Sequence, residues 1–495
     1  MKKFVYIISI IATFCNYTYA QESRTLDLQE TIRIAADSSL YAYKYKNQLE
    51  SSYWEFRSYK AERLPSLALN LMPIEYYRYL TKRYDSANDL DVYRQQQMFT
   101  SSAALSLTQN FDPLGGYFYV TSSIERLRNY GSSDYTQYST VPIKIGYNNS
   151  LLGYNEHRWD KRIAPLKYQK AKLYYLYYME YLSSMAIQYF FNLASAQAKF
   201  NLAIQQSAQC DTLYNIGKRR AEIAAITQTD LMRLRLDAVK AKTAKTSAEV
   251  ELKEARMRLA SFLRMNPNTE LHINMPGVLP DFEIDTKKAL EMMHKNSYEL
   301  LDVEQAVLEA EQTLDKVRKQ TRFQASIGAS VGFNQQGDEV SKAYKDHMRQ
   351  DIVSVNINIP LLDWGVNKGK RNMAYNQMEV ARISAQQTMA EKEQEVLVTI
   401  SELNSRRELY STAEETLTLA DKVYDQTMKR FISGSSDLTS LAQAQQNRLS
   451  AQESYISAIY EFWNCYYKLR RQTLFDFSIG FSLSDKFDFE NEINK

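Results

Sequence analysis

The stretch IPLLDWGVNKGKR (359–371) joins two different kinds of sequence pattern. Before it, apolar and polar residues alternate one by one, which is typical of a β-strand. After it, apolar residues return every three or four positions, which is typical of an α-helix. A related stretch, NSLLGYNEHRWDK (149–161), lies 210 positions earlier and makes the same change. The chain therefore contains this strand-to-helix junction twice, with the turn residues Leu151, Leu152 and Gly153 in the first copy and Pro360, Leu361, Leu362 and Gly365 in the second.

The offset of 210 positions continues without a gap from these junctions to two later breaks. The breaks are RAEIAAITQTD (220–230) and RFISGSSDLTS (430–440). Between junction and break the pattern predicts very long helices, over 155–220 and 365–430, each of about 98 Å at ~1.5 Å per residue. Return helices are predicted over 231–264 and 438–473. One apolar stripe of the second long helix repeats in heptads, at Ala413, Leu417, Ala420, Tyr424, Met428 and Phe431.

A second offset, of 258 positions, relates the opening helices of the two halves. A helix is predicted over 25–64, and its stripe returns 258 positions later with the same spacing of three and four. The two stripes are Ala42, Tyr45, Leu49, Ser52, Phe56 and Tyr59, and Leu300, Val303, Val307, Ala310, Leu314 and Val317. This spacing is that of a coiled-coil seam. The sequence therefore predicts an internal tandem duplication of helix, strand, strand, long helix, turn and return helix.

Four strands are predicted, two in each half. The clearest is FQASIGASVGFN (323–334), and the others lie at 66–71, 141–148 and 353–359. In each strand one face is mostly apolar and the other carries Ser, Asn, Gln or Gly. The two offsets differ by 48 residues, so the first half holds extra material at about 72–140, including the turn signal DPLGG (112–116) between two short strands.

The duplication divides the chain into a first repeat over 21–265, a linker over 266–285, a second repeat over 286–473 and a polar tail over 474–495. Residues 1–20 form a predicted signal peptide, with Lys2 and Lys3 before an apolar core and small residues before a cleavage point after Ala20. An uncleaved membrane anchor is the alternative. Cys15 follows Phe14, which is not a small residue, so lipidation is not expected.

Composition gives no sign of enzyme chemistry. The chain has 14 Gly and 9 Pro in 495 residues, well below the usual ~7% and ~5%, which favours long uninterrupted helices. Its net charge of +3 gives no reason to expect a nucleic-acid partner. The four His, at positions 157, 272, 294 and 347, show no metal-ligand spacing, and there is no Gly-rich phosphate loop. We expect no catalytic residues, metal or cofactor, and we expect Cys210 and Cys465 to stay unpaired because the helix directions separate them.

The strands have the alternation and the length of about ten residues that suit a membrane strand. A soluble sheet with one buried face would show the same alternation. However, these strands are joined to very long helices that are polar on most faces. Four strands cannot close a membrane barrel, which needs about eight, and open sheet edges are not tolerated in lipid. Other copies of the chain are therefore expected to complete the sheet, and the helices to form a tunnel.

At this point the chain resembles the TolC-like outer membrane efflux protein family over nearly all of its predicted mature length. The resemblance is carried by IPLLDWG (359–365), similar to the family's strand-to-helix turn, and by RFISGSSDLTSLAQAQQNRLSAQ (430–452), similar to its distal-turn signature. It implies a mainly α fold with a membrane β-barrel part. In that fold, long antiparallel coiled-coil helices form a periplasmic tunnel, and about four strands per protomer complete a trimeric barrel of twelve strands.

The resemblance also implies a function and a set of partners. The function is an outer-membrane exit duct of a tripartite efflux or type I secretion system. The partners are two further copies in a homotrimer, a periplasmic adaptor (membrane fusion protein), an inner-membrane RND or ABC transporter, and outer-membrane lipid. Drug efflux and protein secretion are both open. The alternative function is a non-conducting periplasmic coiled-coil scaffold, which would share the heptads and the signal peptide but leave the strands unexplained.

Two groups of candidate site residues follow from the resemblance. Adaptor docking is expected at the distal turns, with Arg220 and Ala224 in the first and Arg430, Phe431 and Gly434 in the second; a plain helix-ending Gly is the alternative for Gly434. The gate candidates lie at the start of the return helices: Asp230, Arg233, Asp437, Ser440 and Gln443. Asp230 and Asp437 could instead simply cap those helices. If they gate, we expect Arg233 to offset Asp230 and neutral hydrogen bonds to close the rest.

Overall fold

The computed structural model describes residues 23–113, 115–130, 134–151, 153–223, 226–276, 279–433, 435–436, 438–487 and 489. The chain forms two compact units. The sheet unit comprises Ser51–Lys170 and Glu299–Thr388, and the helical unit comprises the rest of the described chain. The predicted signal peptide (1–20), Leu152, Ala224, Gly434, Asp437 and residues 490–495 lie outside the described residues.

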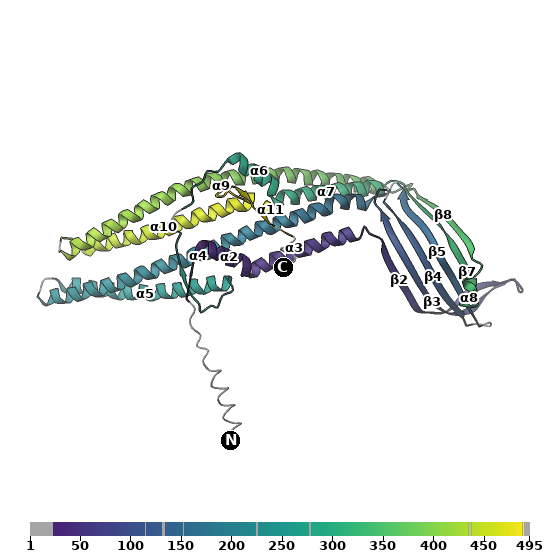
Figure 1. The fold of residues 1–495 in the computed structure, drawn as a ribbon, viewed down its shortest axis with the longest axis horizontal. Coiled ribbons are helices and arrows are strands. Elements are labelled where there is room, and N and C mark those ends of the chain that lie inside the picture. Colours follow the sequence, from purple (N-terminus) through teal and green to yellow (C-terminus); the bar gives the residue numbers. More distant parts are fainter. Residues whose placement is uncertain are drawn as a thin grey trace, which may run out of the picture. The chain divides into compact units, whose positions relative to one another are not determined.

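The two predicted long helices are present and are equal in length. Helices α4 (Glu156–Glu222) and α9 (Val366–Ile432) have 67 residues each, and both ends of α9 lie 210 positions after those of α4. The return helices α5 (Gln228–Phe262) and α10 (Leu438–Thr473) begin with the same offset (Figure 1). Basic residues close both long helices, Arg219 and Arg220 in α4 and Lys429 and Arg430 in α9, where they complement the negative end of the helix dipole.

The opening helix of each half is broken once, so the single helix predicted over 25–64 is wrong. The first half has α2 (Leu28–Ser38) and α3 (Leu40–Ala61), and the second has α6 (Thr286–Asn296) and α7 (Tyr298–Gln320). The break falls at Ser39 and at Ser297, which are 258 positions apart and both extended. The Ser39 hydroxyl accepts a hydrogen bond from the Ala42 backbone N–H at 3.1 Å, so it begins a new helix rather than continuing the old one.

The predicted coiled-coil seams are confirmed. In the helical unit, Tyr45 of α3 stacks on Tyr178 of α4 with ring centroids 4.4 Å apart. In the sheet unit, Phe56 stacks on Tyr168 at 5.0 Å. Leu314 of α7 is buried against Ala374 and Met378 of α9, with Ala310 and Val317 beside it. Packing of these stripes, rather than the local helix preference of each residue, holds the helices together.

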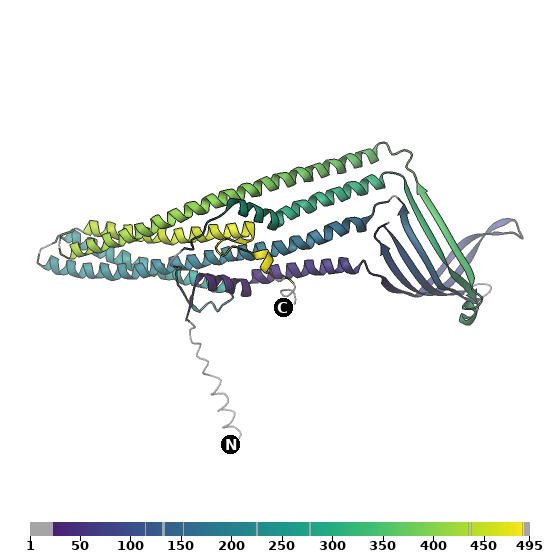
Figure 2. The same cartoon turned by 45° about the horizontal axis from the view of Figure 1, so that its top comes forward.

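The sheet has six strands, so the prediction of about four strands per protomer is wrong. The strands are antiparallel and follow the order β2-β3-β4-β5-β7-β8, from dark blue to green in Figure 1. Their bounds are β2 Ser66–Asp85, β3 Leu90–Phe111, β4 Gly116–Asn129, β5 Tyr135–Leu151, β7 Gln324–Gly337 and β8 Met348–Asn358. The short helix α8 (Val340–Ala343) lies between β7 and β8. Figure 2 shows the curl of the sheet, with β2 and β8 at its two edges.

The two additional strands come from the surplus of the first half. The predicted DPLGG turn joins β3 to β4, and Gly115 adopts a φ of 76° there, which glycine tolerates best. Arg63, two residues after the end of α3, forms an ion pair with Asp112 of this turn. The β2–β3 ladder runs on to the pair Asp85–Leu90, whereas the β3–β4 ladder ends at Met98–Asn129, so the tip of the first hairpin is a two-stranded ribbon.

Small elements lie in the segments predicted as linker and tail. Strand β6 (Glu270–Ile273), within the predicted linker, pairs in parallel with β1 (Ser23–Leu26). The predicted tail starts with buried Leu474 and Phe475 and forms β9 (Phe475–Asp476), β10 (Phe481–Ser482) and α11 (Leu483–Lys486). These contacts fix the start of both segments to the helical unit.

Among the described helices, none combines the length and the hydrophobicity that a membrane crossing requires.

Candidate functional site

The six strands share one apolar face. Leu67, Leu107, Val120, Ile145 and Val331 are paired in register across five neighbouring strands, from β2 to β7. A second row, Phe118, Tyr147, Ala329 and Val353, continues from β4 to β8. Because side chains alternate between the faces of a strand, each row presents its side chains on one side of the sheet.

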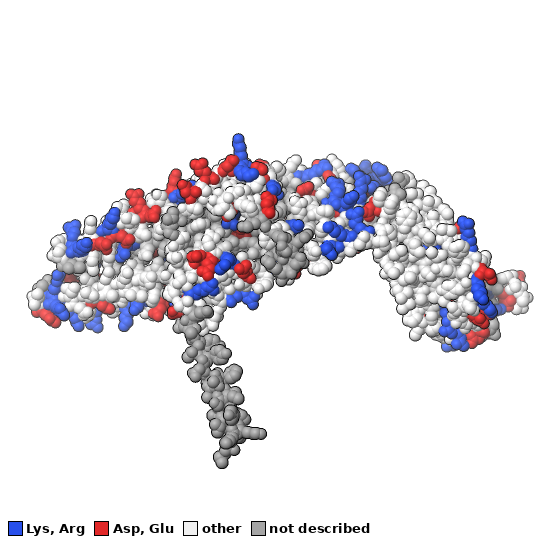
Figure 3. Space-filling model, in the orientation of Figure 1, with Lys and Arg blue, Asp and Glu red and all other residues white. Residues whose placement is uncertain are grey.

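The opposite face is polar or small. Ser106, Thr121, Lys144 and Gly332 form its register row from β3 to β7. Charged pairs gather instead at the loop ends of the strands, such as Arg349 with Asp351 and Arg128 with Asp134. Figure 3 shows the body of the sheet as a band without charged side chains in that view, with charges at its loop end. A sheet with one apolar and one polar face is suited to separate lipid from water.

The two strand-to-helix turns occupy equivalent positions in the two repeats, but their backbone conformations differ. In the second turn Trp364 and Gly365 have positive φ angles of 53° and 90°. The Asp363 carboxylate accepts hydrogen bonds from the N–H groups of Gly365 and Asn367, at 3.0 Å each, and so caps α9. In the first turn Gly153 occupies the position of Asp363, and a Cβ there would overlap Ser150. The cap of α4 is provided instead by Asn155, whose side chain accepts from Arg158 N–H at 3.2 Å.

The apolar turn residues differ in exposure between the two copies. Leu361 is 92% exposed and Leu362 is 71% exposed, next to Pro360. Leu151, the counterpart of Leu361 in the first turn, is 40% exposed. The first turn is also tied down, because Asn155 donates to the Asp112 carbonyl oxygen at 2.7 Å.

At the distal turns the structure places the predicted docking residues in different surroundings. Arg220 and Arg430 are exposed at the ends of α4 and α9. Phe431 is half-buried, and it packs with Met428 and Leu213 against a cluster formed by Tyr424, Leu441 and Ala444. Phe431 thus contributes to packing between helices as well as to the surface.

Among the gate candidates, Asp230 forms a capping box at the start of α5. Its carboxylate accepts hydrogen bonds from the Thr227 hydroxyl at 2.7 Å and from the Thr227 N–H at 3.3 Å. Thr227 Oγ1 in turn accepts from the Asp230 N–H at 3.1 Å. The Thr227 hydrogen bonds hold the pKa of Asp230 below its usual value, and the charge of Arg233 adds a smaller effect.

The second-half gate positions are polar and uncharged where they are described. Gln443 donates to Asn447 Oδ1 at 2.9 Å within α10. Ser440 is exposed in the first turns of the same helix. Nearby, Arg448 forms an ion pair with Asp421 of α9 at 2.6 Å and lies over the ring of Tyr424 at 4.9 Å.

Comparison with known proteins matches most of the second half of the chain to a known family. Residues 290–471 match the sequence model of the family described as "Outer membrane efflux protein". The chain carries an outer membrane efflux protein domain. This finding confirms the resemblance predicted from the turn and tip motifs. No curated protein sequence matches the chain.

Solved structures of outer membrane channels share the fold of this chain. The Campylobacter jejuni CmeC outer membrane channel has a TM-score of 0.67 at 15% identity, covering 94% of this chain and 88% of the channel. For the outer membrane protein VceC of Vibrio cholerae the TM-score is 0.62 at 13% identity, and the match covers 90% of this chain and 95% of VceC. The open-state MtrE outer membrane channel of Neisseria gonorrhoeae has a TM-score of 0.59 at 15% identity, and the match covers 90% of this chain and 88% of MtrE. At these identities the likeness establishes the fold.

A buried charge cluster in the helical unit was not predicted from the sequence. Arg470 of α10 contacts Glu180 of α4 through Nη2 at 3.0 Å and Asp476 of β9 through Nη1 at 2.9 Å. Asp476 Oδ1 also accepts from the Tyr466 hydroxyl at 2.5 Å and from the Ser478 hydroxyl at 2.6 Å. Asp476 lies six positions after Arg470, but Glu180 is 290 residues away from Arg470, so only the fold brings Glu180 to the other two charges. The polar composition of the tail was the sole signal in the sequence.

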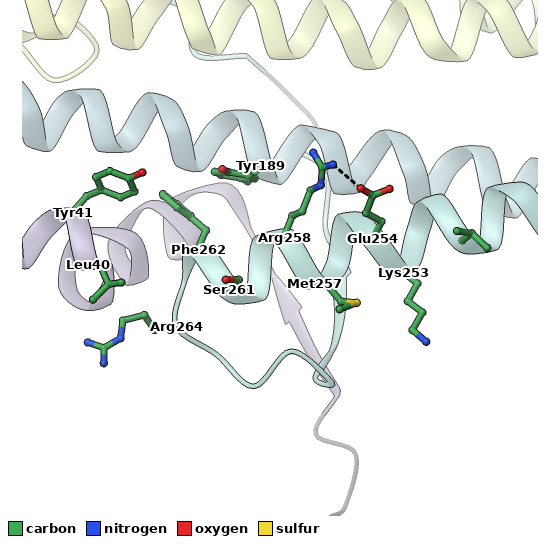
Figure 4. A pocket seen from close by; sticks show the side chains of 11 residues that line it. Leu40, Tyr41, Tyr189, Lys253, Glu254, Met257, Arg258, Ser261, Phe262 and Arg264 are labelled. Atoms are coloured by element: carbon green, nitrogen blue, oxygen red, sulfur yellow. Dashed lines mark hydrogen bonds and ion pairs between the residues drawn. The ribbon is translucent and has the colours of Figure 1, made fainter.

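A groove on the helical unit was also not predicted. It has a volume of about 1030 Å³ and lies between the last turns of α5, the start of α3 and Tyr189 of α4 (Figure 4). Glu254 and Arg258 form an ion pair of 2.5 Å at its wall, and Met257 is exposed beside them. Met257 continues a stripe of exposed apolar residues along α5 at heptad spacing, formed by Met232, Leu236, Val239 and Val250.

Cys210 and Cys465 are both free thiols. Among the described residues, His, Cys, Asp and Glu form no group that could hold a metal ion.

Proposed function

We propose that this protein is the outer-membrane exit duct of a tripartite efflux or type I secretion system. It would pass substrates from an inner-membrane pump across the periplasm and the outer membrane. The observation that carries the proposal is the six-stranded sheet with one mainly apolar face and one polar face, in a chain whose helices α4 and α9 have 67 residues each. The efflux protein domain and the fold shared with outer membrane channels support it.

The proposed assembly is a homotrimer in the outer membrane that extends into the periplasm. Six strands are fewer than the roughly eight that the smallest membrane barrels contain, which supports completion by further copies. The exposed heptad stripe of α5 supports helix packing between copies. The proposed partners are a periplasmic adaptor at the distal turns, with Arg220 and Arg430 as contacts, and an inner-membrane RND or ABC transporter. We propose no nucleic-acid partner, because the net charge of +3 gives no reason to expect one.

Conduction requires a shaped pore and a gate rather than bond chemistry. The polar sheet face would line the exit, and the starts of α5 and α10 would form the periplasmic constriction. We place Asp230, Arg233, Ser440 and Gln443 at that constriction, together with Asp437, which is outside the described residues.

Two neighbouring positions in β7, an inner strand of the sheet, test the proposal. Ala329 lies on the apolar face and Ser330 on the polar face. A lysine on a lipid-facing position near the middle of the membrane costs about 2–4 kcal/mol. Ala329→Lys should therefore remove most of the protein from the washed outer-membrane fraction, whereas Ser330→Lys should leave its amount unchanged.

Export is measured in the same strains, as resistance to toxic compounds and as secretion of proteins to the medium. The Ser330→Lys protein should complement a deletion strain in at least one of these assays. A protein found in the soluble periplasm, with both variants behaving alike, would instead support the non-conducting scaffold.

A further inference from the structure

The two outer edges of the sheet are unpaired. Within the described residues, β2 pairs only with β3 and β8 only with β7, so each has one side whose backbone N–H and C=O groups meet no other strand. Unpaired strand edges recruit other strands in water and are not tolerated in lipid. Both edges therefore need a partner in the assembled protein.

The edge strands are also the most exposed part of the apolar face. In β2, Leu67 is 66% exposed and Leu71 is 64% exposed, and in β8 Val353 is 74% exposed. In the inner strands, Leu105 and Ile145 on the same face are 43% and 48% exposed. The difference marks one missing neighbour beside each edge.

The turn that follows β8 extends this apolar edge. Leu361, Leu362 and Trp364 are 71–92% exposed, in contrast to the tied-down turn of the first repeat. At the other edge, Leu64 just before β2 is 65% exposed. Each edge thus has an apolar end at the level where the sheet meets its helices, and two such ends from different copies would cover one another.

Strand direction makes the two edges compatible. Strand β2 runs away from its helix α3, and β8 runs toward its helix α9. Since the six strands alternate in direction, β8 of one copy and β2 of the next are antiparallel when the copies stand side by side. An even number of strands per copy lets the alternation continue around a closed barrel.

The first hairpin, formed by β2 and β3, shares the apolar face of the other strands, and we call these six strands together the wall of the barrel. Leu69 of β2 pairs with Leu105 of β3, and Leu107 pairs with Val120 of β4. These residues continue the apolar face of β5, β7 and β8. A hairpin that folded into the pore as a plug would present this apolar face to water.

We infer that the β2 edge of one copy pairs with the β8 edge of a second copy, and that each copy contributes six strands to the barrel. The inference rests on the proposed trimeric duct. Three copies then form a barrel of about eighteen strands rather than twelve, with a diameter larger by about one half, because diameter grows roughly in proportion to strand number. Barrels of 16–18 strands enclose an open aqueous channel. The occupant of each free edge is thus a second copy of this chain.

Disulfide crosslinking in intact cells tests the seam. In a background with Cys210→Ser and Cys465→Ala, we would combine Leu69→Cys with Val353→Cys, Val355→Cys or Ile357→Cys in turn. The competing set combines Val120→Cys with the same three positions, because β4 would become the edge if the first hairpin left the wall. Single-cysteine variants control for random collisions.

At least one Leu69 combination should give covalent dimers and trimers after oxidation, and the Val120 combinations should give none above the single-cysteine level. Crosslinks through Val120 and not through Leu69 would overturn the six-strand wall and leave the trimer intact. A Leu69 ladder that ends at a covalent dimer would support the seam and contradict the trimer. Absence of crosslinks from both sets in protein that is trimeric in the outer membrane would overturn the seam.

Neighbouring residues of β3 give a second measurement. Spin labels on Leu105→Cys and Ser106→Cys report whether each side chain meets lipid or water. The Leu105 label should collide mainly with dissolved oxygen in the membrane, and the Ser106 label mainly with a water-soluble nickel complex. Water accessibility of both labels would place the hairpin outside the wall.

Discussion

Arg470 of α10 holds Asp476 of the C-terminal segment at 2.9 Å, and the same guanidinium reaches Glu180 of α4 at 3.0 Å. The three side chains are only 9–14% exposed. Burial acts to raise the pKa of Asp476, but hydrogen bonds from Ser478 and Tyr466 and the charge of Arg470 outweigh it and hold that pKa below its usual value. Burial raises the pKa of Glu180 despite Arg470. The cluster therefore depends on its single cation.

Arg470→Met should destabilise the helical unit by about 3–5 kcal/mol, because it leaves two buried carboxylates without a partner. The measurement is urea unfolding of the detergent-solubilised protein. The exposed pair Glu254–Arg258 is the control, where Glu254→Gln should change the unfolding free energy by less than about 1 kcal/mol. Adding Glu180→Gln and Asp476→Asn to Arg470→Met should recover part of the loss. Equal effects at both pairs would show that the buried cluster does not stabilise the fold.

The capping box of Thr227 and Asp230 predicts the pH dependence of the α5 start. The pKa of Asp230 is lowered on folding, so its contribution is fully present above its unfolded pKa and is lost as pH falls through the lower folded value. Hydrogen exchange of residues 228–236 should therefore keep its protection at every pH above about 3.8 and weaken only below it. Thr227→Ala should weaken protection at neutral pH as well. Unchanged exchange in Thr227→Ala would argue against the cap.

The gate is expected to respond weakly to multivalent cations. Asp230 is engaged by Thr227, Arg233 is nearby, and the described second-half positions Ser440 and Gln443 are uncharged. Single-channel recordings in planar bilayers should show little block by low concentrations of a trivalent cation on the periplasmic side. Strong block that disappears in Asp437→Asn would instead reveal an acidic ring.

Variants at the distal turn should distinguish an effect on adaptor docking from an effect on folding stability. Arg430→Glu should reduce export and leave urea unfolding unchanged, because the side chain is exposed. Phe431→Ala should reduce both, with a stability loss of about 2 kcal/mol, because the half-buried ring packs on the Tyr424 cluster. Gly434→Trp tests the tip beside them. Full export by folded Arg430→Glu and Gly434→Trp proteins would remove the docking role from this turn.

Cys465 should resist thiol reagents in the folded protein. Burial raises the pKa of its thiol to about 11, and its Sγ–H donates to the Thr399 carbonyl oxygen at 3.6 Å. Very little thiolate, the reactive form, is present at neutral pH. Labelling with a maleimide should modify Cys465 only after unfolding in urea, as mass spectrometry of its tryptic peptide would show. Modification of the native protein within minutes would mean that α10 opens easily.

The sequence by itself determined the helical part of this protein and its duplication. Residues such as Tyr45, Leu314 and Tyr424 follow alternating spacings of three and four over many turns, and few Gly or Pro interrupt this pattern. A long periodic pattern outweighs local uncertainty, so α4, α9 and their return helices were predicted closely. The helix breaks at Ser39 and Ser297 were not predicted, because a serine can either continue a helix or cap the next one with its hydroxyl.

Only the tertiary structure decided how many strands form the wall and which charges meet. The alternation in β3 and β4 is interrupted by polar residues such as Ser122, so the sequence marked short strands there without showing that they pair in register with β2 and β5. Strand pairing joins residues far apart in the chain, and its register depends on turns and bulges that a periodic pattern does not encode. Arg470 and Glu180 are likewise 290 residues apart. Their contact exists because folding removes both side chains from water at the same place, where each charge is stable only beside the other.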